Sequence, residues 1–377
     1  MPESKTPAVF YRGGTSKAVF FHTSDLPEDP GERDQMLLNV LGSPDPYGRQ
    51  LNGLGGGISS LSKAMWVERS KRNDADIDYT FAQIAIGEPV VDYSANCGNM
   101  SSAVGQFAIE EGIFPVPDGD AVIRMYNTNT DICVHSHFKV EDGQAVTQGD
   151  LEIPGVFGTG APVRLEFQDP SRVTGRGLLP TGHVRETIDA PGFGEVPVSI
   201  VDASALCVFV PAEVFGLKAT ESPEEIEAKG DVMAGLDVIR REAAVRAGFS
   251  ETADATPLSA PRVAIVARPS NFTSLDGREY HRQDFDLAVR MLSMGTVHRA
   301  VMVTAAMCLA AASAIEGSVP NLFASSDGDE GTLKLGNPSG ITSMGACVSK
   351  ANGAWQAKST SIMRTCRRLM DGHVYHP

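Results

Sequence analysis

The sequence has few cysteines and no long hydrophobic run, and both absences narrow the class of protein. Its six cysteines are scattered over 377 residues without a Cys-x-x-Cys pair, which argues against a disulfide framework or a zinc ribbon and favours a reducing cytoplasm. The longest apolar stretch, residues 300–315, contains Thr304 and Ser313 and falls short of the ~20 residues that span a bilayer. We expect a helix buried inside a domain there.

Basic residues are also scarce relative to acidic ones. The 32 Lys and Arg against 47 Asp and Glu give a net charge of −15, which repels phosphate backbones and anionic membrane surfaces. We therefore expect neither nucleic acid nor a membrane as a partner. With 42% apolar and 21% charged residues, the composition is that of a globular protein, and the length suits two domains of ~150 residues.

Short runs of β-branched and aromatic residues outnumber helical patterns. Bounded by Gly, Pro, Asn or Asp, they predict strands at 8–11, 18–22, 64–68, 77–86, 121–127, 132–140, 163–167, 199–202, 207–210 and 263–267. Apolar residues at helical spacing predict helices at 30–41, 101–111, 223–247, 283–292 and 296–315.

This layout predicts an α+β fold of two pseudo-symmetric lobes. Each lobe is expected to wrap a curved, mainly antiparallel sheet around one central helix, 101–111 in the first and 296–315 in the second. Turn signals cluster in the Pro- and Gly-rich segment 178–197, so we place the boundary at residue 185. The N-terminal lobe is then 1–185 and the C-terminal lobe 186–377.

The segment Asn96-Cys97-Gly98-Asn99 stands directly before the predicted helix 101–111. Free backbone N–H groups and the positive end of the helix dipole at such a place stabilise a thiolate or a bound carboxylate. The alternative is that Cys97 only fills a gap in the packing. Because the flanking Gly and Asn indicate an exposed turn, we favour a functional thiol.

A glycine-rich loop, residues 50–62, leads into Lys63 and the predicted strand 64–68. Its glycines let the backbone approach a ligand closely, but Ile58 stands where a dinucleotide fingerprint needs glycine. Lys63 precedes an apolar run, and partial burial would suit it to act as a base. A surface lysine at the start of a strand remains the alternative.

Three further patterns are weaker. The turn from Arg12 to Lys17 offers an arginine and two hydroxyls suited to carboxylates, although a plain hairpin explains it almost as well. The small-residue turn Gly336-Asn-Pro-Ser-Gly340 is by itself only a turn signal. One predicted strand carries potential metal ligands at alternating positions, which share a face and resemble a metal site: Cys133, His135 and His137. No fourth ligand is near, so we expect no metal.

Ordered motifs along the whole chain resemble the family that contains 2-methylaconitate isomerase (PrpF) and the 4-oxalomesaconate isomerases and tautomerases. The motifs lie at residues 12–16, 42–46, 59–63, 96–99, 180–182, 292–295 and 336–340. The resemblance implies a diaminopimelate-epimerase-like fold, an active site in the cleft between two lobes, no cofactor, and Lys63 with Cys97 as the acid/base pair.

Two departures refine this expectation. Racemases and epimerases of the fold carry a second cysteine at the turn that matches Gly336–Gly340, and this chain has none there, which argues against stereoinversion. The family's turn commonly has a histidine where this chain has Asn337. Residues 48–51 and 55–63 are most similar to the 4-oxalomesaconate Δ-isomerases of lignin-derived aromatic catabolism.

We therefore expect a cofactor-independent 1,3-allylic isomerase that moves a C=C bond by proton transfer in a keto tricarboxylate, with 4-oxalomesaconate as the first candidate. The alternatives are 2-methylaconitate isomerisation in propionate metabolism and a non-catalytic carboxylate-binding module, and a homodimer is left open. The expected substrate-binding residues are Arg12, Thr15, Ser16, Ser60, Gly98, Asn99, Ser339 and Gly340.

Overall fold

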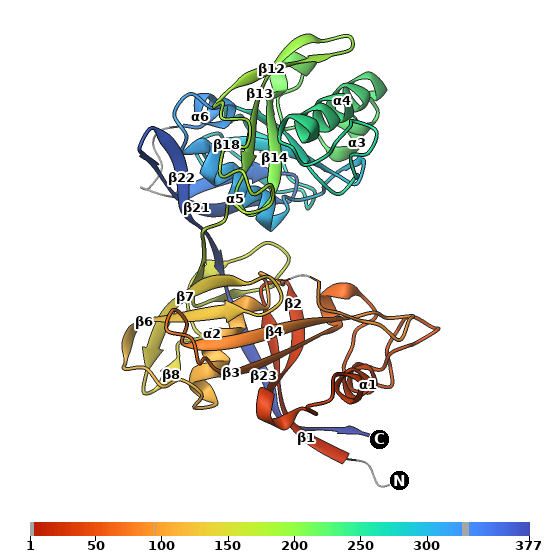
Figure 1. The fold of residues 1–377 in the computed structure, drawn as a ribbon, viewed down its shortest axis with the longest axis vertical. Helices are drawn as coiled ribbons and strands as arrows, with labels where there is room; N and C mark the ends of the chain where they lie inside the picture. Colours follow the sequence, from red (N-terminus) through yellow and green to blue (C-terminus); the bar gives the residue numbers. More distant parts are fainter. Residues whose placement is uncertain (1–3, 95, 326–331) are drawn as a thin grey trace. The chain divides into compact units, whose positions relative to one another are not determined.

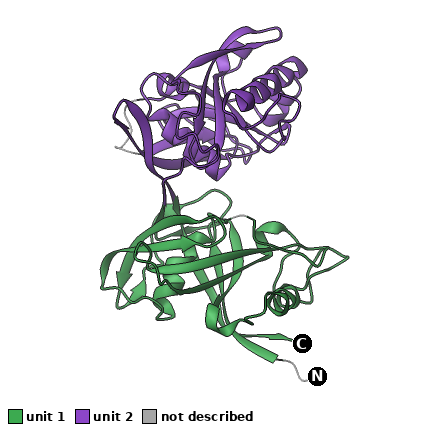
Figure 2. Cartoon of the chain, in the orientation of Figure 1, with its two compact units in different colours: residues 1–166, 363–377 green, residues 167–362 purple. Residues whose placement is uncertain are grey.

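The computed structural model describes residues 4–94, 96–325 and 332–377. Contacts divide the chain into two compact units (Figure 2): unit 1 comprises residues 1–166 and 363–377, and unit 2 comprises residues 167–362. Strands far outnumber helices in both (Figure 1), so the fold is of the α+β class that the sequence predicts. In the described part of the chain, no helix is both long and apolar enough to cross a membrane.

The sheet of unit 1 alternates between antiparallel and parallel pairing. β1–β2, β3–β4 and β6–β7 are antiparallel, β2–β3 and β4–β6 are parallel, and β23 pairs antiparallel with β1. The strands are β1 (Ser4–Gly13), β2 (Ser16–His22), β3 (Lys63–Arg69), β4 (Ile77–Ile84), β5 (Val91–Asp92), β6 (Gly119–Asn127), β7 (Ile132–Glu141), β8 (Gln144–Ala145), β9 (Leu151–Glu152), β10 (Thr159–Gly160) and β23 (Cys366–His376).

Two α-helices pack on the strands of unit 1. α1 (Pro30–Leu41) begins at the N-cap Asp29 and ends at Gly42, whose φ of 77° is left-handed, and it coincides with the predicted helix. α2 (Ser101–Glu110) contacts β1, β3, β6, β8 and β23. Its Phe107 is fully buried against the rings of Tyr11 and Phe20, and such burial contributes about 1.5–3 kcal/mol. The segment that leads into α2 is thereby fixed.

The sheet of unit 2 repeats the pairing order of unit 1. β13–β14, β15–β18 and β20–β21 are antiparallel, while β14–β15 and β18–β20 are parallel. The strands are β12 (Glu186–Ala190), β13 (Gly194–Asp202), β14 (Leu206–Pro211), β15 (Arg262–Ala267), β16 (Phe272–Thr273), β17 (Glu279–Tyr280), β18 (Leu287–Ser293), β19 (Thr296–Val297), β20 (Thr332–Asn337) and β21 (Gly340–Ala351). β11 (Val163–Gln168) and β22 (Ala354–Arg364) each run from one unit into the other.

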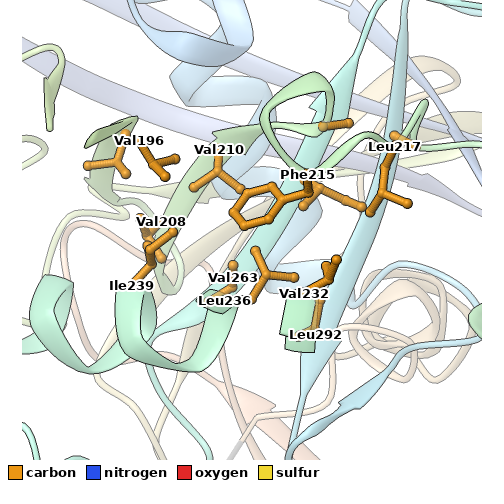
Figure 3. Close-up of a cluster of buried hydrophobic side chains, with 14 of the residues drawn as sticks. Val196, Val208, Val210, Phe215, Leu217, Val232, Leu236, Ile239, Val263 and Leu292 are labelled. Atoms are coloured by element: carbon orange, nitrogen blue, oxygen red, sulfur yellow. The ribbon is translucent and has the colours of Figure 1, made fainter. Parts of the chain in front are cut away.

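The helices of unit 2 are α3 (Pro223–Glu227), α4 (Gly230–Arg246), α5 (Val303–Ser313) and α6 (Val319–Phe323). α4 lays Val232, Leu236 and Ile239 against the valines of β13, β14 and β15 (Figure 3). α5 is apolar almost all round and contacts β13, β14, β20 and β21. Each unit thus holds one buried helix among its strands, α2 in unit 1 and α5 in unit 2.

Three predicted helices differ from those observed. The pattern at 223–247 forms two helices, and the pattern at 296–315 yields the strand β19 followed by the shorter α5. The helix predicted at 283–292 is wrong, because Leu287–Ser293 is the strand β18. β18 lies between β15 and β20 with nearly every residue buried, so it has no polar face to mark the two-residue repeat of a strand.

The limits of the two units also differ from a division at residue 185. The chain leaves unit 1 after residue 166 and returns to it at residue 363. The return places β23 beside β1, in a register that runs from Ser4 opposite His376 to Gly13 opposite Cys366. Pairing between the two ends of a chain depends on contacts far apart in sequence, which local patterns do not indicate.

Candidate active site

Lys63 is the first residue of β3, and its side chain is directed into unit 1. The residue is only 7% exposed. Its Nζ donates a hydrogen bond to Oε1 of Gln83, the residue opposite it on β4, and lies 5.0 Å from the centroid of the Phe81 ring. Among the described residues Lys63 has no carboxylate partner. A neutral amide and an aromatic face therefore hold the amine, and no salt bridge competes for its proton.

Gln83 is itself held in place by the backbone. Its Nε2 donates to the carbonyls of Ser59 and Ser62, at 3.0 and 2.8 Å. Both carbonyls belong to the loop that precedes Lys63, where the short 3-10 helix η2 (Ser59–Leu61) carries the half-buried Ser60. With Nε2 fixed in this way, Oε1 of Gln83 is directed at the lysine.

The glycine-rich loop packs around a buried glutamine. Gln50 is 1% exposed, and its Nε2 donates to the hydroxyls of Ser43 and Ser62 at 2.9 and 2.7 Å. Its Oε1 accepts from the N–H of Gly57 at 3.0 Å, and a Cβ at Gly55 would lie 2.3 Å from the same side chain. The backbone of the glycine-rich loop therefore packs closely against Gln50, where the sequence predicts a close approach to a ligand. Gln50 anchors the loop that leads into Lys63.

Cys97 lies one turn before α2. Its carbonyl accepts from the N–H of Ser101 at 2.9 Å, and its own N–H donates to Oδ1 of Asn96 at 2.7 Å. The thiol is half-buried. The neighbouring Gly98 lies in the same turn and is also half-exposed. The predicted position of the cysteine at the start of a helix is therefore observed.

Tyr79 connects this turn to β4. The tyrosine is almost fully buried, and its hydroxyl is hydrogen-bonded to Ser101 at 3.1 Å and to Nδ2 of Asn96 at 3.0 Å. Burial raises the pKa of Tyr79 above its usual range, and its hydrogen bonds to Ser101 and Asn96 oppose this effect. Because Tyr79 and Phe81 alternate on β4, they share a face. Lys63 and Cys97 therefore border the same face of this strand.

Arg364 is a site residue that the sequence does not predict. It is partly buried at the end of β22, and its Nε donates to Oδ1 of Asn99 at 3.0 Å. Burial lowers the pKa of Arg364 to about 10. Through its bond to Asn99, the guanidinium is held at the turn that contains Cys97.

The β1–β2 turn completes this cluster. A Cβ at Gly14, which has a φ of +52°, would lie 2.3 Å from Oδ1 of Asn99 and 3.1 Å from Cδ of Arg364. Nδ2 of Asn99 donates to the hydroxyl of the exposed Thr15 at 3.0 Å. A residue without a side chain at position 14 is therefore what lets Asn99 and Arg364 meet here.

Arg12 and Ser16 stabilise the same turn. Nη1 of Arg12 donates to the carbonyls of Gly14 and Thr365 at 3.0 and 2.9 Å, and burial lowers its pKa. Ser16 is 3% exposed and lies opposite Gly13 in the register. At least one arm of the arginine is therefore occupied by backbone carbonyls.

Ser339 and Gly340 belong to unit 2. The Ser339 hydroxyl donates to the carbonyl of Arg299 at 2.6 Å, in the segment before α5. Gly340 has a φ of +120°, and a Cβ there would lie 2.8 Å from the Tyr280 hydroxyl. The other predicted site residues, including Lys63 and Cys97, lie in unit 1.

Comparisons with known proteins identify the family of the chain. Residues 3–377 match the family model described as PrpF protein. The chain is 38% identical to the 2-methyl-aconitate isomerase of Cupriavidus necator, over 100% of this chain and 98% of that protein. It is 33% identical to the 4-oxalomesaconate tautomerase of Pseudomonas putida, over 99% and 97% of the two chains. A crystal structure of methylitaconate-delta-isomerase matches with a TM-score of 0.93 and 35% identity, covering 100% of this chain and 96% of that one.

Proposed function

This chain belongs to the PrpF family and is an isomerase, and we propose that it moves a carbon–carbon double bond by a 1,3-allylic proton shift in a small polycarboxylate. The observation that carries the proposal is that Lys63 and Cys97 border one face of β4, while Arg364 is hydrogen-bonded to Asn99 in the turn of the thiol. Two groups able to hold protons and one cation suffice for this chemistry.

In the proposed reaction, Lys63 acts as the base and removes a proton from the carbon next to the double bond. The electron pair that is released moves into the conjugated system, and its charge develops on a carboxylate or keto oxygen. The protonated Lys63, or the Cys97 thiol, then delivers a proton to the far carbon of the allyl unit. The double bond has moved, and no atom is gained or lost. Proton transfer of this kind contributes typically ~10²–10⁴-fold in rate.

The developing negative charge needs donors that are already in place. Arg364 and the N–H groups of residues 98–99 before α2 are the candidates in unit 1, because Arg364 bonds Asn99 in the same turn as the half-buried Cys97. Thr15, held by Asn99, presents a hydroxyl at the same turn. Cys97 acts in this scheme either as the second proton carrier or as a thiol that stabilises the enolate.

Stereoinversion is disfavoured on sequence and topology together. The two units have the same order of strand pairings, and we propose that they are pseudo-symmetric lobes of a diaminopimelate-epimerase-like fold. In unit 2 the segment that precedes α5 corresponds to that of Cys97 before α2, and it reads His298-Arg299-Ala300. Neither this segment nor the turn 336–340 contains a cysteine, so no second thiol is available at either place.

Two tricarboxylates are candidate substrates. The 38% identity to a protein named 2-methyl-aconitate isomerase exceeds the 33% identity to a 4-oxalomesaconate tautomerase, so we place 2-methylaconitate first. The glycine-rich loop and residues 48–51 favour 4-oxalomesaconate. The purified protein should therefore be assayed with both compounds, following the conjugated absorbance and the proton NMR spectrum of the product.

The outcome separates the proposals. Turnover of one compound at a kcat/KM at least about tenfold above the other assigns the substrate, and ~1.4 kcal/mol of discrimination is sufficient for this. In D₂O the product should carry deuterium at the new C–H bond. Binding of both compounds without turnover or exchange would contradict the isomerase proposal and favour a carboxylate-binding module.

A further inference from the structure

A second cluster of reactive side chains lies in unit 1, outside the residues of the proposed acid/base chemistry. His135 and His137 alternate on β7, and Glu166 lies on β11, which pairs with β7. One ligand atom from each residue lies within 4.8 Å of the others, and Nε2 of His137 is 3.1 Å from Oε2 of Glu166. We propose that His135, His137 and Glu166 form a binding site for a transition-metal dication, with Zn²⁺ as the best fit.

The donor set suits this ion. Zinc takes imidazole nitrogen and carboxylate oxygen at about 2.0–2.2 Å, and sites with two histidines, one glutamate and one open position are common. Ligand atoms at those bond lengths lie about 3.4 Å apart in a tetrahedral site. The separation between His137 and Glu166 is already close to this value, and the ligand atom of His135 lies within 4.8 Å of both. All three residues are half-buried, so the site stays open to water at its fourth position.

The proposed metal site differs from the row of Cys133, His135 and His137 that the sequence pattern suggests. Cys133 precedes the two histidines in the alternating row, but its Sγ lies 3.6 Å from the carbonyl oxygen of Asp74 and is not part of the cluster. Glu166 takes its place as the third ligand. It reaches the histidines through a pairing of strands some 29 residues apart.

The guanidinium of Arg164 would compete with the metal ion for His137 and Glu166. Its Nη2 lies 3.1 Å from Nδ1 of His137, and its Nη1 lies 3.9 Å from Oε2 of Glu166. The arginine side chain is 44% exposed, and it lines an open groove together with His137. A metal ion would therefore displace an exposed guanidinium into solvent. The proposal then makes an unusual prediction, that removal of Arg164 tightens metal binding.

The test is a calorimetric titration of metal-free, full-length protein with Zn²⁺, in a Cys97→Ser background that removes the thiol of the proposed active site. We expect one ion per chain. His135→Ala and His137→Ala should each weaken binding by at least about tenfold. Arg164→Gln should strengthen it, and His373→Ala, at an exposed histidine of β23, should leave it unchanged.

Cobalt supplies a spectroscopic readout on the wild-type chain. Co²⁺ at this site should give visible ligand-field bands without a thiolate-to-metal charge-transfer band, because its donors are nitrogen and oxygen. Binding that survives the His135→Ala/His137→Ala double variant, a thiolate band, weaker binding in Arg164→Gln, or no binding at all would each overturn the proposal. Thermal unfolding of the double variant without metal checks that its fold is intact.

Discussion

Nε of Arg364 donates a hydrogen bond of 3.0 Å to Oδ1 of Asn99, although 265 positions separate the two residues in the chain. The bond joins the end of β22 to the turn that precedes α2, two residues after Cys97. It is possible because Gly14 has no side chain where the two groups meet. The environment of the proposed catalytic thiol is therefore assembled from three distant parts of the sequence.

Replacement of Arg364 should impair turnover more than its contribution to folding explains. Arg364→Met keeps the length of the side chain but removes the positive charge beside Cys97 and the hydrogen bond to Asn99. We expect kcat/KM to fall by about ten- to hundredfold, which corresponds to a loss of about 1.4–2.7 kcal/mol of stabilisation of the developing anion. Steady-state kinetics with the preferred tricarboxylate measure this effect.

The matched control for that variant is Arg367→Met, at an exposed arginine of β23 three residues further along. It removes one positive charge of the same kind and should leave kcat/KM within about twofold. Arg364→Lys should recover part of the loss, because the charge returns without the planar donor group. Equal losses in the Met variants at positions 364 and 367 would reduce the role of Arg364 to bulk electrostatics.

Lys63 is expected to be indispensable as the base. Lys63→Ala should lower kcat by ~10²–10⁴-fold, while the melting temperature changes little, because the amine makes one side-chain hydrogen bond and one ring contact. Lys71→Ala, at an exposed lysine just beyond β3, is the control and should be fully active. If Lys63→Ala keeps more than roughly a tenth of the wild-type kcat with an intact fold, the base is another group.

The sequence predicts local structure well where one face of an element is polar. α1 has both a capping aspartate and a terminal glycine, and its limits are those predicted. The opposite case is β18, whose buried residues include Arg290 at 1% exposure. In the sequence, Arg290 inside an apolar run suggests the polar face of a helix. In the structure, backbone carbonyls, including that of Glu221, hold its guanidinium within the sheet.

Some residues of the candidate sites can likewise be predicted from the sequence, and others cannot. Local context makes Lys63 and Cys97 candidates, since a glycine-rich loop and a helix start are both visible in the sequence, and the family resemblance supplies their predicted roles. Arg364 and Glu166 are not, because each joins its partners through strand pairing between distant segments. An arginine in a strand has no feature that separates it from other surface arginines until its neighbours are known.

Chelation should leave catalysis unchanged. The proposed proton transfers use an amine, a thiol and a guanidinium, and the proposed metal ligands are not among them. Prolonged dialysis against a strong chelator, followed by removal of the chelator, should therefore give the same kcat and KM. Activity that falls and then returns with a divalent ion would mean that a metal takes part in the reaction, and it would contradict the mechanism given for Lys63.

Alkylation distinguishes an activated thiol from one that is merely exposed. Cys97 is half-buried beside Arg364, Cys347 is exposed on β21, and Cys308 is fully buried in α5. Burial raises the pKa of Cys308 well above its ordinary value, with Cys207 adding to the effect, so Cys308 should react only on unfolding. Exposure alone would place Cys347 first. We expect Cys97 to react faster than Cys347, because the cation and the start of α2 stabilise its thiolate.

Mass-spectrometric mapping after brief treatment with iodoacetamide measures all three rates in one sample. Addition of whichever tricarboxylate is turned over should slow the labelling of Cys97 and leave that of Cys347 unchanged, which gives an internal control for reagent depletion. Arg364→Met should slow the labelling of Cys97 alone. If Cys97 reacts no faster than Cys308, or if substrate gives no protection, the cysteine is a packing residue.

The kinetics of Cys97→Ser complete the assignment. A fall in kcat indicates proton transfer by the thiol, whereas a rise in KM at unchanged kcat indicates that Cys97 only helps to bind.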